Sequence, residues 1–213
     1  MRKFLAASVL ASGLAAPGLA SAQDLTITGG FSLVSRYVSS GVEQTTGAAF
    51  QPWLEAEYRG LYLNLWASNT DDLITGSDIE VDVTIGYRGE VGKFSYDLGY
   101  VRYYYRNPSV DCCGEAFVSF GYAVTDSLAL GLAFAHDPVA DYVDSSFNFE
   151  YAINDKFGVA GEYGSISNGG QKYWNIGATY AINDNVGITG AWHDNDINDG
   201  TFVLSLDTSF NIR

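Results

Sequence analysis

The chain has 213 residues and a formal net charge of −14, and it is 47% hydrophobic and 15% aromatic. A strongly acidic chain repels nucleic acid and anionic surfaces, so we expect no nucleic-acid partner. The high content of apolar and aromatic residues excludes a disordered acidic chain, and the length suits one domain.

The N-terminal segment has the features of a cleavable export signal. A basic pair at positions 2–3 precedes an apolar stretch over residues 4–16, and Ala20-Ser21-Ala22 is a small-residue cleavage site. We expect a signal peptide over residues 1–22 and one domain over residues 23–213. The alternative, a retained membrane anchor, would need a longer apolar run.

After this segment, apolar and polar residues alternate with a period of two almost to the end of the chain. The clearest run places Ile79, Val81 and Val83 on one face of a strand. Their neighbours Glu80 and Asp82 fall on the other face. No later run has the length and apolarity of a transmembrane helix. We predict strands over residues 25–37, 49–58, 61–69, 77–88, 93–105, 115–124, 128–136, 145–153, 157–164, 172–181, 186–193 and 201–211.

The predicted strands are long, and their connections alternate in length. Most strands have about nine to twelve residues, which is what a tilted strand needs to cross a membrane. Strands in soluble sheets average about five or six. Short turns such as 59–60 and 183–185 alternate with longer polar loops such as 38–48 and 106–114. We therefore predict a single all-β domain: a transmembrane, antiparallel, up-and-down β-barrel of about twelve strands in the outer membrane of a Gram-negative bacterium.

A five-residue motif recurs at equal spacing in the second half of the chain. It reads Tyr-Ala-Val-Thr-Asp from Tyr122, and Tyr-Ala-Ile-Asn-Asp from Tyr151 and from Tyr180. Each tyrosine ends a predicted strand just before a short turn. Tyrosine favours the membrane–water interface, where the ring lies in hydrocarbon and the hydroxyl in water. We predict that these three are interface aromatics; a hairpin repeat in a soluble sheet would not explain the strand lengths.

The polar faces of the strands are rich in carboxylates. In a lipid-embedded barrel the apolar face points outward and the polar face lines the lumen. An acidic lumen attracts cations and excludes anions. Against these carboxylates we find only the basic residues Arg36 and Arg88. The predicted lumen carboxylates are Glu55, Glu57, Glu80, Asp82, Asp97, Glu150, Glu162 and Asp207.

The simplest function for such a barrel is a porin-like channel for passive diffusion of cations or small polar solutes. Its other expected partners are outer-membrane lipid, lipopolysaccharide and the barrel-assembly machinery. The alternative is a filled barrel that does not conduct and acts as a structural or surface-binding protein, since barrels of this size need not hold an open pore.

Several short motifs carry a family resemblance. Residues 35–44 are similar to the pattern S-x-Y-x-x-R-G-x-S-Q, and further matches lie at 66–69 and, most closely, between 80 and 105. In this order the motifs resemble the TorF-type porin family. The family's Arg before Gly is Ser40 here, and its Ser before Gln is Glu43, so a role for that Arg does not carry over. The resemblance implies a small outer-membrane barrel that acts as a porin, without a defined substrate.

The sequence gives weak signals for catalysis or metal binding. His136 and His193 each precede an Asp at the start of an outer loop. Adjacent strand residues point to opposite faces, so each Asp is badly placed to orient its own His, and an outer-membrane hydrolase is the weakest alternative. The loop 194–200 is rich in oxygen ligands, but its Gly is one place late for a calcium loop and the distal Glu is missing. We expect no enzymatic activity, cofactor or metal site, and weak binding of a divalent cation by this loop, or bridging to lipopolysaccharide, is a minor alternative.

Cys112 and Cys113 are adjacent in a loop predicted to lie outside the cell. The oxidising compartment permits a disulfide. A vicinal disulfide would close a strained ring, and free or intermolecular thiols are the equal alternative.

Overall fold

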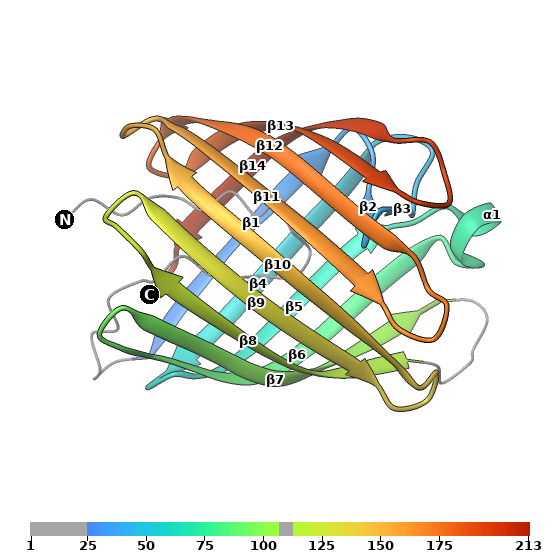
Figure 1. The fold of residues 1–213 in the computed structure, drawn as a ribbon, viewed down its shortest axis with the longest axis horizontal. Helices are drawn as coiled ribbons and strands as arrows, with labels where there is room; N and C mark the ends of the chain where they lie inside the picture. Colours follow the sequence, from blue (N-terminus) through green and yellow to red (C-terminus); the bar gives the residue numbers. More distant parts are fainter. Residues whose placement is uncertain (1–24, 107–112) are drawn as a thin grey trace.

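The computed structural model describes residues 25–106 and 113–213, and within them the chain forms one closed antiparallel β-barrel (Figure 1). Around the barrel the strands follow the order β1-β14-β13-β12-β11-β10-β9-β8-β7-β6-β5-β4, so neighbours in sequence are neighbours in space. The barrel strands are β1 Thr26–Val34, β4 Ala49–Tyr58, β5 Leu61–Asn69, β6 Ile79–Val91, β7 Phe94–Tyr105, β8 Cys113–Ala123, β9 Leu128–Asp137, β10 Tyr142–Ala152, β11 Phe157–Ile166, β12 Lys172–Asn183, β13 Val186–Asn195 and β14 Thr201–Asn211.

The barrel closes between its first and last strands. β1 pairs with β4 on one side and with β14 on the other, with Ser32 opposite Asp207 and Leu33 opposite Leu206. The chain beyond β14 continues this pairing, because the Ile27 N–H donates to the Arg213 carbonyl and the Ile212 N–H donates to the Ile27 carbonyl. Over the described residues every strand of the barrel is paired on both sides, which removes the site at which a sheet would add another chain.

The two faces of each strand differ as the alternation predicts. In β6, Ile85 is 54% exposed and Tyr87 is also exposed, whereas Glu80 is 4% exposed. In β5, Leu61, Leu63 and Leu65 are exposed. Successive strand residues point to opposite sides of a sheet, so the apolar set covers the outside and the polar set faces the interior. The apolar surface of this barrel lies outside, which is the arrangement of a barrel embedded in lipid.

The two ends of the barrel differ. Very short turns join β4 to β5, β6 to β7 and β12 to β13, and both termini of the described chain lie at this turn end (Figure 1). The opposite end, the loop end, carries residues 35–48, 70–78, 138–141, 167–171 and 196–200. Residues 35–48, which we call loop 1, form the longest of these described connections.

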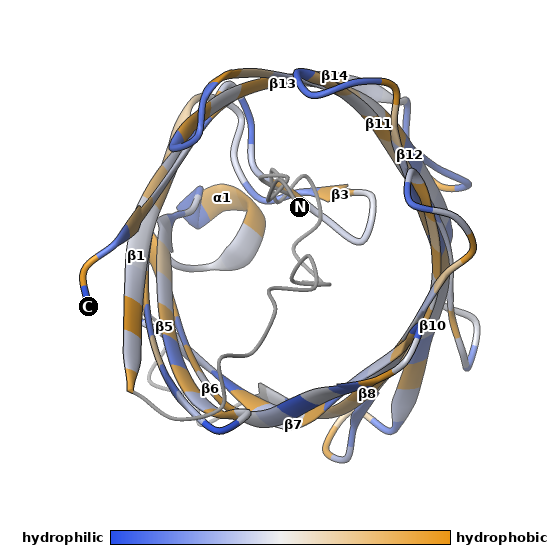
Figure 2. Cartoon of the chain, turned by 90° about the vertical axis from the view of Figure 1, so that its left-hand side faces the viewer, coloured by the Kyte–Doolittle hydropathy of each residue, from blue (hydrophilic) through white to orange (hydrophobic). Residues whose placement is uncertain are grey.

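Loop 1 and the next connection add small elements at the loop end. Loop 1 forms the hairpin β2 (Val38–Ser39) and β3 (Val42–Glu43), whose tip residues Ser40 and Gly41 both have left-handed φ angles, 44° and 77°. Two such residues make the tight turn that matches strand twist. The helix α1 (Asp72–Thr75) is a single turn. Figure 2 shows both within the ring of strands when the barrel is viewed along its length.

Asp71 begins α1 and ties it to loop 1. Its carboxylate accepts hydrogen bonds from the Leu73 N–H (3.1 Å) and from Thr46 Oγ1 (2.8 Å). These hydrogen bonds hold the pKa of Asp71 below its ordinary value of 3.8. Loop 1 and α1 therefore form one connected structure at the loop end.

The predicted fold class and strand number are confirmed, and most boundaries agree to within a few residues. β1 ends at Val34 rather than at residue 37, because the chain turns inward to form loop 1. β10 begins at Tyr142, three residues before the prediction. β2, β3 and α1 were not predicted, since two-residue strands and a single helical turn leave no periodic signal. The predicted signal peptide lies outside the described residues.

In the part of the chain that the structure describes, no helix has the length and apolar character needed to cross a membrane.

Candidate functional site: the inner wall of the barrel

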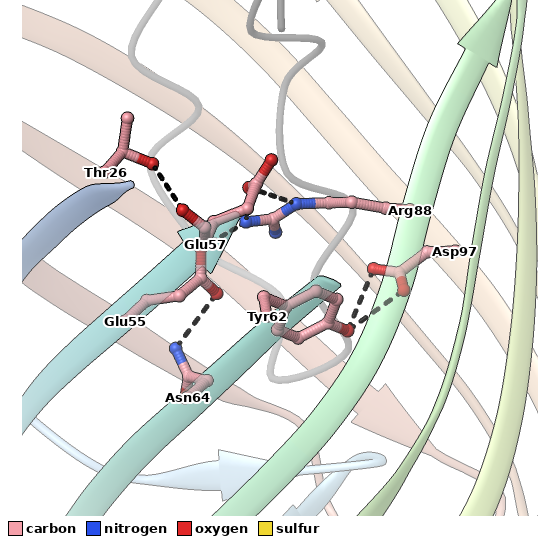
Figure 3. Close-up of polar contacts among 7 residues, drawn as sticks. All are labelled: Thr26, Glu55, Glu57, Tyr62, Asn64, Arg88 and Asp97. Carbon is pink, nitrogen blue, oxygen red and sulfur yellow. Dashed lines mark hydrogen bonds and ion pairs between the residues drawn. The ribbon is translucent and has the colours of Figure 1, made fainter. Parts of the chain in front are cut away.

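One group of lumen residues is centred on Arg88, near the turn end (Figure 3). The Arg88 guanidinium forms ion pairs with Glu55 and with Glu57, and its Nε donates to Glu57 Oε2 at 2.9 Å. Glu55 and Glu57 belong to β4 and Arg88 to β6, with β5 between them. Side chains can meet over an intervening strand on the concave side of a barrel, so these contacts place all three residues on the inner wall.

Tyr62 extends this group to β7. The guanidinium of Arg88 lies 4.4 Å from the centroid of the Tyr62 ring, and the Tyr62 hydroxyl donates to Asp97 Oδ1 at 2.9 Å. Asn64 Nδ2 donates to Glu55 Oε2 at 3.3 Å. The Arg88 cluster, which we define as Glu55, Glu57, Tyr62, Arg88 and Asp97, thus joins three carboxylates to one cation.

A second group lies at the loop end and is built from carboxylates and tyrosines. Tyr105 donates to Glu80 Oε1 at 2.7 Å. Glu115 accepts one hydrogen bond from Tyr103 (2.6 Å) and one from Tyr142 (2.7 Å). Asp82 lies beside them, since it pairs with Tyr103 in the register of β6 and β7. We call Glu80, Asp82 and Glu115, with these tyrosines, the loop-end acidic cluster.

The loop-end acidic cluster differs from the Arg88 cluster in its charge balance. The ion pairs found between described residues join Arg36, Arg88, Arg106 and His136 to acidic partners, and none of them includes a carboxylate of the loop-end cluster. Tyrosine hydroxyls are neutral donors, so they satisfy carboxylate oxygens without cancelling the charge. The acidic side chains at this end of the inner wall are therefore not offset by any of these ion pairs.

Loop 1 contacts the inner wall at strands that are not neighbours of β1, the strand from which it leaves. Ser40 Oγ donates to Asp144 Oδ2 at 3.0 Å, and Gln171 Nε2 donates to the Ser40 carbonyl at 2.6 Å. Asn195 Nδ2 donates to the Gly41 carbonyl at 2.5 Å. Loop 1 leaves from β1 and is anchored at β10, β13 and the connection before β12, so it crosses the loop end of the lumen.

Tyr37 of loop 1 lies next to the loop-end acidic cluster. Its side chain is 6% exposed, and its ring meets the Trp66 ring edge-on with the centroids 5.5 Å apart. Burial, together with the nearby charges of Glu80 and Asp82, raises the pKa of Tyr37 well above its ordinary value of 10. Tyr37 is therefore a neutral phenol next to two carboxylates.

The remaining predicted lumen carboxylates lie on the other half of the wall. Asp207 accepts hydrogen bonds from Ser32 (2.6 Å) and Ser205 (2.7 Å), and Glu162 accepts one from Asn175 (3.3 Å). Glu150 in β10 lies opposite Ala129 of β9 and Ala160 of β11. Small residues dominate the inner positions of this half, including Gly131, Ala133, Ala135, Gly158, Gly177 and Ala191.

Three of the residues singled out in the sequence do not join the inner-wall clusters. Arg36 pairs with Glu43 of its own loop (2.6 Å). His136 is exposed and His193 is buried. By strand alternation His136 lies on the outer face of β9 and His193 on the inner face of β13, so the two histidines do not share a site. Asp137 is buried while His136 is exposed, which places the two on opposite faces as predicted.

The predicted interface tyrosines share one place in the fold. Tyr122, Tyr151 and Tyr180 are all exposed and lie near the turn-end limits of β8, β10 and β12. Cys112 lies outside the described residues, so the prediction for the cysteine pair stays a prediction. Among the described residues, no three His, Cys, Asp or Glu side chains come close enough to hold a metal ion.

Sequence reasoning missed Glu115, Asp144 and the tyrosines that surround the loop-end cluster. Glu115 begins a predicted strand and Asp144 falls just before one, so neither was assigned to a face. The Tyr103-Tyr104-Tyr105 run ends the stretch between residues 80 and 105 in which the family resemblance is closest. Its alternation was the available signal, because Tyr103 and Tyr105 must share a face with Asp97 of the same strand.

A family model described as "Bacterial protein of unknown function (Gcw_chp)" matches residues 19–211. The chain belongs to this family. The Gcw_chp description assigns no activity, and it is not the TorF-type name that the motifs suggested. A search of curated protein sequences gave no match.

Solved structures share the fold of this Gcw_chp chain. A "KdgM porin" superposes with a TM-score of 0.68 at 11% identity, covering 86% of this chain and 99% of that chain. A "KdgM porin in complex with disordered oligogalacturonate" gives 0.66 at 11% identity, covering 87% and 99%. A "NanC porin" gives 0.56 at 13% identity, covering 88% and 99%. At these identities the likeness establishes the fold, which is that of a small porin barrel.

Proposed function

We propose that this protein is an outer-membrane channel through which cations or small polar solutes diffuse passively. The observation that carries the proposal is the charge of the inner wall. Carboxylates line it from the Arg88 cluster to the loop end, and at the loop end no basic side chain of the described residues pairs with Glu80, Asp82 or Glu115. A passage with such a lining concentrates cations.

The outer face supports a place in the membrane. Leu54, Leu63, Phe147 and Leu204 belong to a continuous set of exposed apolar side chains on neighbouring and opposite strands. Each Å² of such surface costs about 25 cal/mol in water, and lipid removes that cost. Monomeric soluble proteins rarely expose an apolar surface of this extent.

Barrel size and lining support a lumen that is not filled by side chains. Barrel diameter grows with strand number, and about eight strands already give an interior that side chains can just fill. A barrel of this size with alanine and glycine at many inner positions of β9–β13 has more room than its lining occupies. The likeness to the KdgM porin supports the fold only, and we do not extend its oligogalacturonate ligand to this chain. An acidic wall would repel such an anionic sugar polymer.

The direct test is ion current through the purified, refolded protein in planar lipid bilayers. We expect discrete conductance steps in KCl and, under a KCl gradient, a reversal potential of the sign that cation preference gives. Glu80→Gln with Asp82→Asn should reduce this preference. The matched control, Asp126→Asn with Asp184→Asn, removes the same charge from exposed short turns and should leave the preference unchanged. An anion-selective reversal potential would contradict the proposal.

Loop 1 gives a specific reason to keep a second candidate, the filled barrel without conduction. Its anchors at Asp144, Gln171 and Asn195 hold it across the loop end. If these contacts are permanent, the barrel serves as a rigid support for its outer loops. Absence of conductance steps in wild type and in a variant without the Ser40 anchor would favour this candidate.

A further inference from the structure

The loop-end acidic cluster contains two carboxylate oxygens that no described residue satisfies. Among the described residues, Glu80 Oε2 and Asp82 Oδ1 are buried and have no hydrogen-bond partner. Glu80 as a whole is 4% exposed. A buried polar atom without a partner costs about 1–3 kcal/mol, and more when it is charged. Such orphaned oxygens point to a missing donor.

The two side chains are arranged to serve the same ligand. Glu80 and Asp82 are separated by one residue in β6, so their side chains leave the same face of the barrel wall. The other oxygen of Glu80 is occupied by the Tyr105 hydroxyl at 2.7 Å, which orients the carboxylate. The unpaired oxygen of Glu80 is therefore held in one orientation.

Aromatic rings surround these carboxylates on both sides and above. Asp82 is paired with Trp66 on β5 and with Tyr103 on β7, and directly opposed strand residues have Cβ atoms about 4.5–5.5 Å apart. Tyr37 of loop 1 packs on Trp66 and closes the site from the loop end. Rings of tyrosine and tryptophan attract organic cations through their faces.

We propose that Glu80 and Asp82, with the rings of Tyr37 and Trp66, bind the ammonium or guanidinium group of an organic solute inside the lumen. This inference rests on the proposed channel function and names the chemical class of one of its solutes. An ammonium carries three N–H donors and a guanidinium carries five, so either group can donate a hydrogen bond to each of the two free carboxylate oxygens. The neighbouring rings add cation–π attraction, which a neutral polar solute would not gain.

Binding is tested apart from conduction, by isothermal titration calorimetry of the refolded barrel in detergent micelles. The probes are butylammonium chloride and methylguanidinium chloride, with 1-butanol as the uncharged probe and CaCl₂ as the metal probe. We expect the two organic cations to bind and 1-butanol not to bind. Glu80→Gln with Asp82→Asn should weaken binding about tenfold or more, because hydrogen bonds to charged groups contribute about 1.5–3 kcal/mol.

Two further variants separate the site from a general charge effect. Asp126→Asn with Asp184→Asn, in the short turns, should leave binding of both organic probes unchanged. Trp66→Leu should weaken binding about two- to fivefold by removing a ring while keeping every charge. If the Glu80 and Asp82 variant does not refold, as judged by circular dichroism, the Trp66 variant alone decides.

The possible results distinguish failure of the binding site from failure of the channel function. A barrel that conducts and prefers cations, yet binds neither organic probe, overturns the site and leaves the channel function standing. Binding of Ca²⁺ alone also overturns it, since the ligand class would be wrong. A barrel that binds both probes but shows no conductance keeps the site and removes the channel function. Equal weakening by the turn variant would show a diffuse charge effect and overturn the site.

Discussion

Replacing Arg88 by Leu tests how far water reaches the inner wall. Arg88, Glu55 and Glu57 have side chains that are 22%, 15% and 25% exposed. An exposed ion pair contributes about 0–1 kcal/mol, whereas removing one partner of a buried pair costs about 3–5 kcal/mol. Arg88 serves two such partners and also lies on the Tyr62 ring, a contact of about 0.5–1 kcal/mol. We expect Arg88→Leu to lower the free energy of unfolding by about 2–4 kcal/mol.

The assay is urea unfolding of the barrel in lipid vesicles, followed by tryptophan fluorescence. The midpoint should fall while the slope stays unchanged, because the surface exposed on unfolding is the same. Arg59→Leu is the matched control: Arg59 is an exposed cation in the turn after β4, and its loss should cost about 1 kcal/mol or less. Adding Glu55→Gln and Glu57→Gln to Arg88→Leu should restore most of the lost stability.

Two results would refute this reasoning. A loss below about 1 kcal/mol for Arg88→Leu would show that water screens the Arg88 cluster as completely as a surface ion pair. Failure of Glu55→Gln and Glu57→Gln to restore stability would show that Arg88 acts through packing rather than through charge. In the second case, Arg88→Met should be better tolerated than Arg88→Leu, because Met keeps an unbranched stem.

Three further predictions concern permeation and loop 1. Glu80→Gln with Asp82→Asn should shift the reversal potential in a KCl gradient toward zero, as measured in planar bilayers. We propose that loop 1, which crosses the loop end of the lumen, blocks the channel while it is anchored. Ser40→Ala removes its hydrogen bond to Asp144 and should therefore raise the fraction of time in the open state about tenfold, as measured from single-channel records. The pKa of Asp71 is below 3.8, so its carboxylate should keep the hydrogen bond from Thr46 at pH 3.8 and above. This hydrogen bond should be lost only as the pH falls below 3.8, and the open-state occupancy should rise only in that range.

Controls make these three predictions discriminating. Ser167→Ala removes a hydroxyl of the loop end that accepts the Val143 N–H rather than loop 1, and it should leave open-state occupancy unchanged. Thr46→Val should show at neutral pH the occupancy that wild type reaches only in acid. If open-state occupancy instead changed across the neutral range in wild type, a group other than Asp71 would control loop 1.

The barrel itself was predictable because every strand carries its own period-two signal. In β6 and β12, apolar residues such as Ile85 and Ile176 occupy alternate positions, and one face of each strand is fixed by lipid. The placement of Glu55, Glu57 and Arg88 on a common face followed from the same alternation. Their mutual contact did not, because it depends on curvature bringing β4 and β6 together over β5.

The loop-end structure was not predictable from local pattern. The contacts of Ser40 with Asp144, and of Gly41 with Asn195, join residues far apart in the sequence, and no periodic signal records them. The sequence shows that Ser40 departs from the family pattern, but it does not show the consequence. In the structure the Ser40 hydroxyl donates to the carboxylate of Asp144 across the lumen. The orphaned oxygens of Glu80 and Asp82 likewise appear only when all neighbours are in place.

We propose above all that β5 turns apolar side chains to lipid and polar ones to a water-filled, negative lumen. Cysteine labelling at adjacent positions tests it most directly. In a background with Cys112 and Cys113 replaced by Ser, Leu63→Cys and Asn64→Cys are placed in vesicles. Each is treated with a cationic or an anionic water-soluble methanethiosulfonate. We predict that Asn64→Cys reacts, faster with the cationic reagent, and that Leu63→Cys is protected from both. Ready labelling at Leu63→Cys, or faster reaction of Asn64→Cys with the anionic reagent, would contradict the account.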